Sequence, residues 1–238
     1  MASFVPINHL LQSLPSEDNQ RLVDQAECVR LTLGEVVYES GVALEQVLFP
    51  LDSIVSLLYV LSGDDSAELA VVGNEGVVGL SLFLGGATTT GRAVVQHAGY
   101  ALRVRASVFK AEIGRHGALQ SSLLRYTHAL MTQMMQTAAC NLHHSADQQL
   151  SRWLLMSLDR LPSSRILMTE GLIANMLGMR RDGVAAATDR LRDAGLIKYA
   201  SGEFYVLDRP GLEKRACECY STVAREYQPL LEPAHCSQ

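Results

Sequence analysis

The sequence lacks the features of membrane, secreted and disulfide-bonded proteins. No apolar run reaches the roughly 18 residues of a spanning helix, because Pro50, Asp52 and Ser53 interrupt the best candidate, residues 47–61. The N-terminus has neither a basic region nor a long apolar stretch, which argues against a signal peptide. The five cysteines are odd in number, irregularly spaced and without a CxxC pair. We therefore expect a cytoplasmic protein with no membrane contact and no disulfide framework.

Charged residues are also few, at 19%, whereas apolar residues make up 48% of the 238 residues. This balance excludes a disordered chain and predicts a packed protein of one or two domains. The net charge of −5 arises in residues 1–140, which carry 8 basic and 13 acidic residues. Residues 165–198 carry six basic and four acidic residues. Because nucleic-acid binding requires only a local basic face, the acidic total does not exclude it.

Catalytic motifs are absent from the sequence as well. It contains no Ser/His/Asp, P-loop or HExxH pattern. No glycine-rich dinucleotide loop follows a predicted strand and opens a helix. We therefore expect no enzymatic activity.

Two short helices are expected within residues 7–26, and a strand-rich region follows from residue 28 to residue 106. Its apolar residues are β-branched, and turn signals separate them at intervals of roughly 8–12 residues. This pattern predicts an antiparallel sandwich or barrel. The expected strands include residues 36–38, 47–49, 54–60, 68–72, 92–96 and 100–104.

Glycine and proline almost vanish after Gly117, which predicts a long helix from about Leu119 to His144. Its seam repeats near 3.5 residues, which favours pairing with a second copy of the chain. Packing on the chain's own barrel is the alternative. A further helix is expected over residues 147–161, with a domain boundary near Ser145. The expected seam positions are Leu124, Met131, Met134, Ala138 and Asn141.

Residues 168–207 carry the signals of a winged helix-turn-helix. Thr169 can cap a short helix, and Gly178 ends it in a tight turn. A second helix is expected from near Arg181 to Ala194. Two strands, residues 196–199 and 203–207, then form a hairpin.

The start of the second helix displays Arg180, Arg181 and Asp182 on its outward face. In a helix-turn-helix, this end enters the major groove of DNA. An arginine there can bond a guanine, and an aspartate can accept from a cytosine amino group. An ordinary helical hairpin with a charged, solvated face is the alternative.

These features together resemble the Crp/Fnr family of transcription regulators, over nearly the whole chain. The resemblance implies an α+β chain with an N-terminal antiparallel β-roll of the double-stranded β-helix or jelly-roll type. It places this cyclic-nucleotide-binding-like sensor domain at residues 1–118, a dimerisation helix and hinge at 119–145, and the winged helix-turn-helix domain at 146–238. The matching stretches are LPSEDNQRLVDQA, LGEVVYESG, VVGNEGVVGLSLFLGG, RAVVQ, ACNLHHSADQQLSRWLLM and TEGLIANMLGMRRDGVAAATDRLRDAGLIKY.

The resemblance also implies partners and DNA-contacting residues. It implies a homodimer, formed through residues 119–145, on pseudo-palindromic double-stranded DNA, with RNA polymerase as a further partner. Arg181 and Asp182 match a base-reading pair, and Ala186 replaces a second base-reading arginine. The expected DNA-binding residues are Thr169, Arg180, Arg181, Asp182, Ala186, Arg190 and Lys198.

Where family members bind cyclic nucleotides, this chain has a degenerate pocket. Leu80 replaces the ribose-binding carboxylate, and methionines replace polar adenine contacts on the long helix. We therefore expect no cyclic nucleotide, and the identity of any effector stays open. Arg92 either binds another anion or pairs with a carboxylate. The expected pocket residues are Gly79, Leu80, Ser81, Arg92, Ala93, Met134 and Met135.

Other cofactors have weaker sequence support. An iron–sulfur cluster requires several cysteines near the N-terminus, where Cys28 stands alone, so none is expected. Haem would require an axial ligand such as His97 or a seam methionine, but core packing explains a methionine stripe better. Neither of two further sets predicts a metal site: Cys140, His143 and His144 share one helical face but lack a fourth ligand, and Cys217 and Cys219 are expected to point in different directions.

We predict a sequence-specific DNA-binding transcriptional regulator. The alternative is a sensor of a small molecule, such as a nucleotide, haem or another anion, that acts through protein partners.

Overall fold

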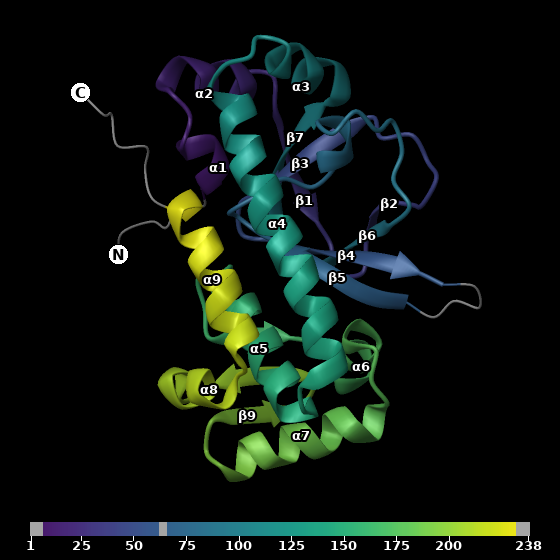
Figure 1. Ribbon diagram of the computed structural model, residues 1–238, viewed down its shortest axis with the longest axis vertical. Helices are drawn as coiled ribbons and strands as arrows, with labels where there is room; N and C mark the ends of the chain where they lie inside the picture. Colours follow the sequence, from purple (N-terminus) through teal and green to yellow (C-terminus); the bar gives the residue numbers. More distant parts are fainter. Residues whose placement is uncertain (1–6, 62–65, 232–238) are drawn as a thin grey trace.

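The N-terminal strands form an antiparallel roll of two sheets (Figure 1). The computed structural model describes residues 7–61 and 66–231. The strands are β1 (Glu27–Leu31), β2 (Val36–Tyr38), β3 (Gln46–Pro50), β4 (Ile54–Val60), β5 (Ser66–Val72), β6 (Arg92–His97) and β7 (Gly99–Arg105). One sheet has the order β1-β7-β3 and the other β2-β6-β4-β5. The predicted α+β class and the strand-rich region are confirmed.

Short helices close the ends of the roll. The two expected N-terminal helices are present as α1 (His9–Gln12) and α2 (Ser16–Val23). The side chain of Asn8 caps α1 and donates to the carbonyls of Pro50 and Gly76, each at 2.9 Å, which fixes α1 to the roll. The sequence did not predict the 3-10 turn η1 (Leu80–Leu82) or the helix α3 (Ala106–Ile113).

The long helix α4 (Ala118–His143) runs along the whole molecule (Figure 1). It begins and ends one residue before the predicted bounds, Leu119 and His144. One face packs on the roll, where the fully buried ring of Tyr126 contacts Gly76 so closely that an added Cβ would lie 2.3 Å from the ring. The buried amide of Gln133 accepts from the Val71 amide nitrogen at 2.7 Å and donates to the Val71 carbonyl at 3.2 Å. Gln133 thereby satisfies an edge residue of β5.

The C-terminal part of the chain, from residue 146, forms a second, separate hydrophobic core. Its elements are α5 (Ala146–Leu158), β8 (Arg165–Leu167), α6 (Glu170–Leu177), α7 (Arg181–Asp193), β9 (Ile197–Ala200) and β10 (Glu203–Val206). The strands form a sheet of order β8-β10-β9. Trp153, Ile173, Leu191 and Phe204 are among the buried residues of this core. The winged helix-turn-helix is confirmed, with β8 as a strand that the sequence did not predict.

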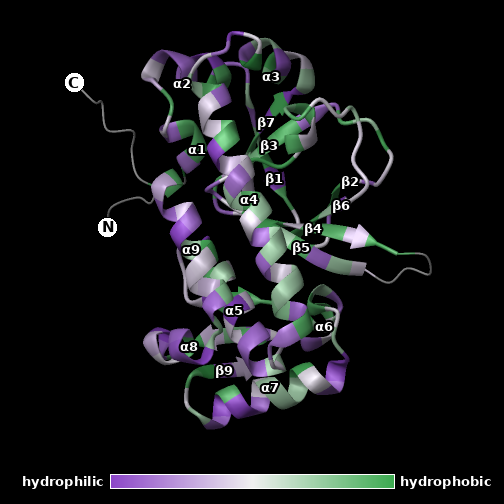
Figure 2. Cartoon of the chain, viewed as in Figure 1, coloured by the Kyte–Doolittle hydropathy of each residue, from purple (hydrophilic) through white to green (hydrophobic). Residues whose placement is uncertain are grey.

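The chain then returns to the long helix. After α8 (Arg209–Arg215), α9 (Glu218–Leu231) lies alongside α4 (Figure 1). Its residues Val223, Tyr227 and Leu230 are buried in the core of the roll and α4, not in the winged-helix core. In Figure 2, α9 and α4 both alternate between hydrophilic and hydrophobic residues, as expected of helices with one packed face. None of the described helices combines the length and hydropathy of a membrane span.

Candidate DNA-binding surface

Local sequence signals set the angle between α6 and α7. The hydroxyl of Thr169 accepts from the Leu172 amide at 3.3 Å and caps α6. Gly178 ends α6 with φ of 62°, a left-handed conformation that favours glycine. The chain turns there, and α7 starts at Arg181. Ala174 of α6 and Val184 of α7 are both buried at this crossing.

The start of α7 presents charged side chains to solvent. The Arg180 side chain is 89% exposed and donates to both oxygens of Asp182, at 3.2 and 2.9 Å. Arg181 is exposed, and its guanidinium lies over Gly171 of α6, where an added Cβ would be 3.3 Å from it. Within residues 7–61 and 66–231, Arg181 makes no ion pair. Its charge is therefore available to a ligand. Ala186 is exposed one turn further along the same face.

A hollow of about 620 Å³ lies between the starts of α6 and α7 and the wing. Tyr199 of β9 closes one side, since its ring packs on Phe204 and its hydroxyl accepts from the Glu170 amide at 3.4 Å. The first turns of both helices border the hollow, and the partial positive charge of a helix N-terminus favours an anion there. Its lining residues are Thr169, Glu170, Gly171, Leu172, Asn175, Arg181, Asp182, Ala185 and Tyr199.

Arg190 and Lys198, two of the expected DNA-binding residues, differ in their surroundings. Arg190 donates through Nε to both oxygens of Asp147, at 2.9 and 3.0 Å, so its guanidinium fastens α7 to α5. Lys198 on β9 is exposed, and among the residues that the structure describes it has no carboxylate within 4.0 Å. Lys198 is thus the better placed of the two for a phosphate.

The residues of the expected effector pocket lie in and around the roll. Leu80 is buried. Gly79, with φ of 98°, directly precedes the 3-10 turn η1, which begins at Leu80. The guanidinium of Arg92 donates to Glu39 at 2.7 Å, which is one of the two alternatives expected for Arg92. Ala93 is fully buried, and Ser81 is half-buried beside Leu80.

The two methionines of that pocket lie on different faces of α4. Met134 packs against the core of the roll, whereas the Met135 side chain is 60% exposed. The expected lining therefore combines a cation already held by a carboxylate with two apolar side chains that face apart.

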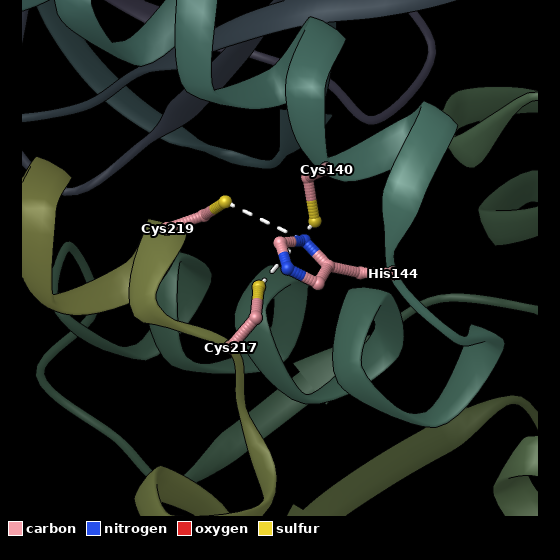
Figure 3. A group of neighbouring side chains, drawn as sticks. All are labelled: Cys140, His144, Cys217 and Cys219. Carbon is pink, nitrogen blue, oxygen red and sulfur yellow. Dashed lines mark hydrogen bonds between the residues drawn. The ribbon is translucent and has the colours of Figure 1, made fainter.

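The structure gathers one group of metal-ligating side chains that the sequence did not join. The ligand atoms of Cys140, His144, Cys217 and Cys219 all lie within 4.8 Å of one another (Figure 3). The expectation that Cys217 and Cys219 point in different directions is wrong, because Cys217 precedes α9 and both thiols reach the same site. His143 is outside the group. The spacings Cys-x3-His and Cys-x-Cys were the available signal.

Comparisons with known proteins agree with this geometry. Residues 148–215 match the family model of the Crp-like helix-turn-helix domain. No curated protein matches the chain.

Solved structures of regulators share the fold. FixK2 from Bradyrhizobium japonicum is similar at a TM-score of 0.69 and 17% identity, over 81% of this chain and 98% of FixK2. A CRP-family transcriptional regulator from Thermus thermophilus is similar at a TM-score of 0.65 and 19% identity, over 79% of this chain and 96% of that regulator. The c-di-GMP-responsive global regulator CLP of Xanthomonas campestris is similar at a TM-score of 0.65 and 12% identity, over 82% of this chain and 100% of CLP. The matched C-terminal domain and the shared fold confirm the resemblance of this chain to the Crp/Fnr family of transcriptional regulators.

Proposed function

We propose that the protein is a homodimeric transcriptional regulator that reads a pseudo-palindromic DNA site with the start of α7. The exposed face of Arg181, Asp182 and Ala186, with an unpaired guanidinium beside the hollow, is the observation that carries this proposal. An α-helix fits the major groove of B-DNA, and arginine is its commonest reader of guanine. Lys198 and the hollow would contact the flanking phosphates.

The exposed face of α4 supports the homodimer. Its apolar side chains stand in solvent although they repeat at alternating intervals of four and three residues. Met131 and Met135 are 56% and 60% exposed, and Leu142 is 79% exposed. A second copy of α4 would cover such a heptad seam. The seam consists of Leu124, His128, Met131, Met135, Ala138 and Leu142.

This seam includes Leu124, Met131 and Ala138 of the five positions expected from the sequence. Met134 faces the core instead, and Asn141 is exposed next to the seam.

In this proposal, the roll is the sensor, α4 is the dimerisation helix and the winged helix binds DNA. Buried hydrogen bonds join the roll to α5, which begins directly after the capping residue Ser145, and to Arg160, two residues after the end of α5. Trp153 donates to Glu68 at 3.2 Å, and the guanidinium of Arg160 pairs with Glu75 at 2.9 Å. A shift in the roll would therefore move α5 and, with it, the spacing of the two α7 helices. RNA polymerase is the proposed further partner.

Binding to a selected DNA site tests the reading residues. Arg181→Ala should weaken binding by about 5- to 150-fold per half-site, equivalent to about 1–3 kcal/mol. Lys198→Ala should weaken binding to all sequences alike and reduce the salt slope by about 0.9 per lost phosphate contact. Arg115→Ala is the matched control, because this exposed arginine follows α3 at the far end of the molecule (Figure 1). Equal affinity of the Arg181→Ala and Arg115→Ala proteins would contradict the proposal and favour a role through protein partners.

A further inference from the structure

Four ligand-type side chains meet at the hinge between the two halves of the molecule. Cys140 lies in the last turn of α4, and His144 follows the end of that helix. Cys217 and Cys219 come from the turn before α9 and from its first turn. The three cysteines are 0–5% exposed and the His144 side chain 16%. Figure 3 shows all four side chains pointing into one space.

Two distances within this Cys₃His cluster are close to the edges of a tetrahedral zinc site, and all of its ligand atoms lie within 4.8 Å of one another. Zinc–sulfur bonds of about 2.3 Å and zinc–nitrogen bonds of about 2.0–2.1 Å place neighbouring sulfurs about 3.8 Å apart and sulfur and nitrogen about 3.6 Å apart. The Cys140 and Cys217 sulfurs are 3.5 Å apart. The Cys219 sulfur is 3.6 Å from Nδ1 of His144. Three thiolates and one imidazole also form a closed ligand set, typical of structural zinc.

The imidazole of His144 has a second partner that suits a metal ligand. Its Nε2 lies 3.4 Å from Oε1 of Glu218, while its Nδ1 faces the sulfurs. Metal-binding histidines commonly donate their other ring N–H to a carboxylate, which fixes the ring and its tautomer.

A buried cation next to the cluster balances its charge. Zinc with three thiolates carries a charge of −1, which is costly to bury unpaired. Arg152 is 4% exposed, and its Nη2 donates at 3.2 Å to Thr137, one turn before Cys140 on α4. Among the described residues no carboxylate lies within 4.0 Å of its guanidinium, and its Nε has no hydrogen-bond partner. The cluster and Arg152 together would be neutral.

We propose that Cys140, His144, Cys217 and Cys219 bind one zinc ion, which fastens the start of α9 to the end of α4. Zinc would displace three thiol protons to solvent and bind the neutral imidazole through Nδ1. None of its four ligands is among the expected DNA-binding residues. It would fix the hinge beside Ser145 and the return of α9, which lies outside the matched residues 148–215.

Metal content and a cobalt probe test the proposal on the full-length chain. Protein expressed with zinc and purified under reducing conditions should contain about one zinc per chain. After removal of zinc by a chelator, Co²⁺ should saturate at one ion per chain, with the visible bands of tetrahedral cobalt and a near-ultraviolet thiolate charge-transfer band. His144→Ala and Cys217→Ser should lose this spectrum. The matched controls His143→Ala and Cys28→Ser should keep it, since His143 and Cys28 are exposed and outside the cluster.

X-ray absorption on the wild-type protein keeps the test decisive if a cluster variant does not fold. The proposal expects three sulfur neighbours and one nitrogen neighbour around zinc. Zinc-free protein that takes up no Co²⁺ would overturn it, as would uptake that is equal in the His144→Ala and His143→Ala proteins. Zinc-free protein with a Cys140–Cys217 disulfide would also overturn it and would assign the pair to thiol oxidation.

Discussion

Glu68 is a carboxyl whose burial favours its protonated form. Ser56 donates to one of its oxygens at 2.5 Å and also lies 2.9 Å from the carbonyl oxygen of Gln96, although a hydroxyl has only one proton. The Gln96 amide is oriented by its bond to Ser157 at 3.1 Å. A protonated Glu68 can donate to Ser56 and free the hydroxyl proton for Gln96. Burial raises the pKa of Glu68 from 4.5 to about 7.

The raised pKa makes the free energy of unfolding depend on pH. Between pH 4.5 and about 7, the folded state keeps a proton on Glu68 that the unfolded state has lost. The contribution of Glu68 to stability therefore falls as pH rises through this window and levels off above it. At about 1.4 kcal/mol per pH unit, the whole change amounts to about 3 kcal/mol.

Glu68→Gln removes this titration and retains the hydrogen bonds. The amide nitrogen can donate to Ser56, and the amide oxygen can accept from Trp153. Relative to wild type, the variant should gain about 3 kcal/mol of stability between pH 4.5 and pH 8.5. Burial also lowers the pKa of His9 and His97, but these groups titrate in both proteins and cancel in the difference.

Urea unfolding at a fixed protein concentration measures the difference, with fluorescence of the single tryptophan, Trp153, as the signal. Glu27→Gln is the control, because the Glu27 side chain is 66% exposed. A constant stability difference between wild type and Glu68→Gln from pH 4.5 to pH 8.5 would refute the reasoning.

Three further predictions concern α4, α7 and the roll. The double variant Leu124→Glu/Met131→Glu should convert a dimer to a monomer in light scattering, because it places carboxylates on both helices of the seam; an unchanged mass would exclude the seam. Gly183→Ala should raise the free energy of unfolding by about 0.5–1 kcal/mol, since nothing lies within 4 Å of an added Cβ in this helix. Gly76→Ala should lower it by about 1–3 kcal/mol, because the added Cβ would overlap the buried ring of Tyr126. Urea unfolding checks both glycine variants, and equal effects would contradict the packing described for them.

Local signals were sufficient to predict the winged helix and the long helix. The Thr169 cap and the Gly178 turn act within a few residues of their own positions, so the sequence shows them directly. The near absence of glycine and proline after Gly117 likewise predicted the helix α4 directly from the sequence. Periodicity was less decisive at the seam. The adjacent residues Met134 and Met135 fit the repeat almost equally, and of these two only Met135 faces outward.

Contacts between distant residues could not be predicted in this way. Arg190 pairs with Asp147 across 43 positions, so its role in joining α7 to α5 was invisible in the local pattern. The Cys₃His cluster depends on the return of α9 to α4, which brings Cys217 within 3.5 Å of Cys140. The three-residue strand β8 likewise exists only through its pairing with β10.

Selection from random double-stranded DNA, on wild-type protein without added ligand, tests the central claim most directly. The account predicts enrichment of a two-fold symmetric site with half-sites about one helical turn apart. The Arg180→Ala/Arg181→Ala protein should lose this enrichment, while Arg115→Ala should retain it. An asymmetric site, no enrichment, or enrichment that survives the double substitution would contradict the account.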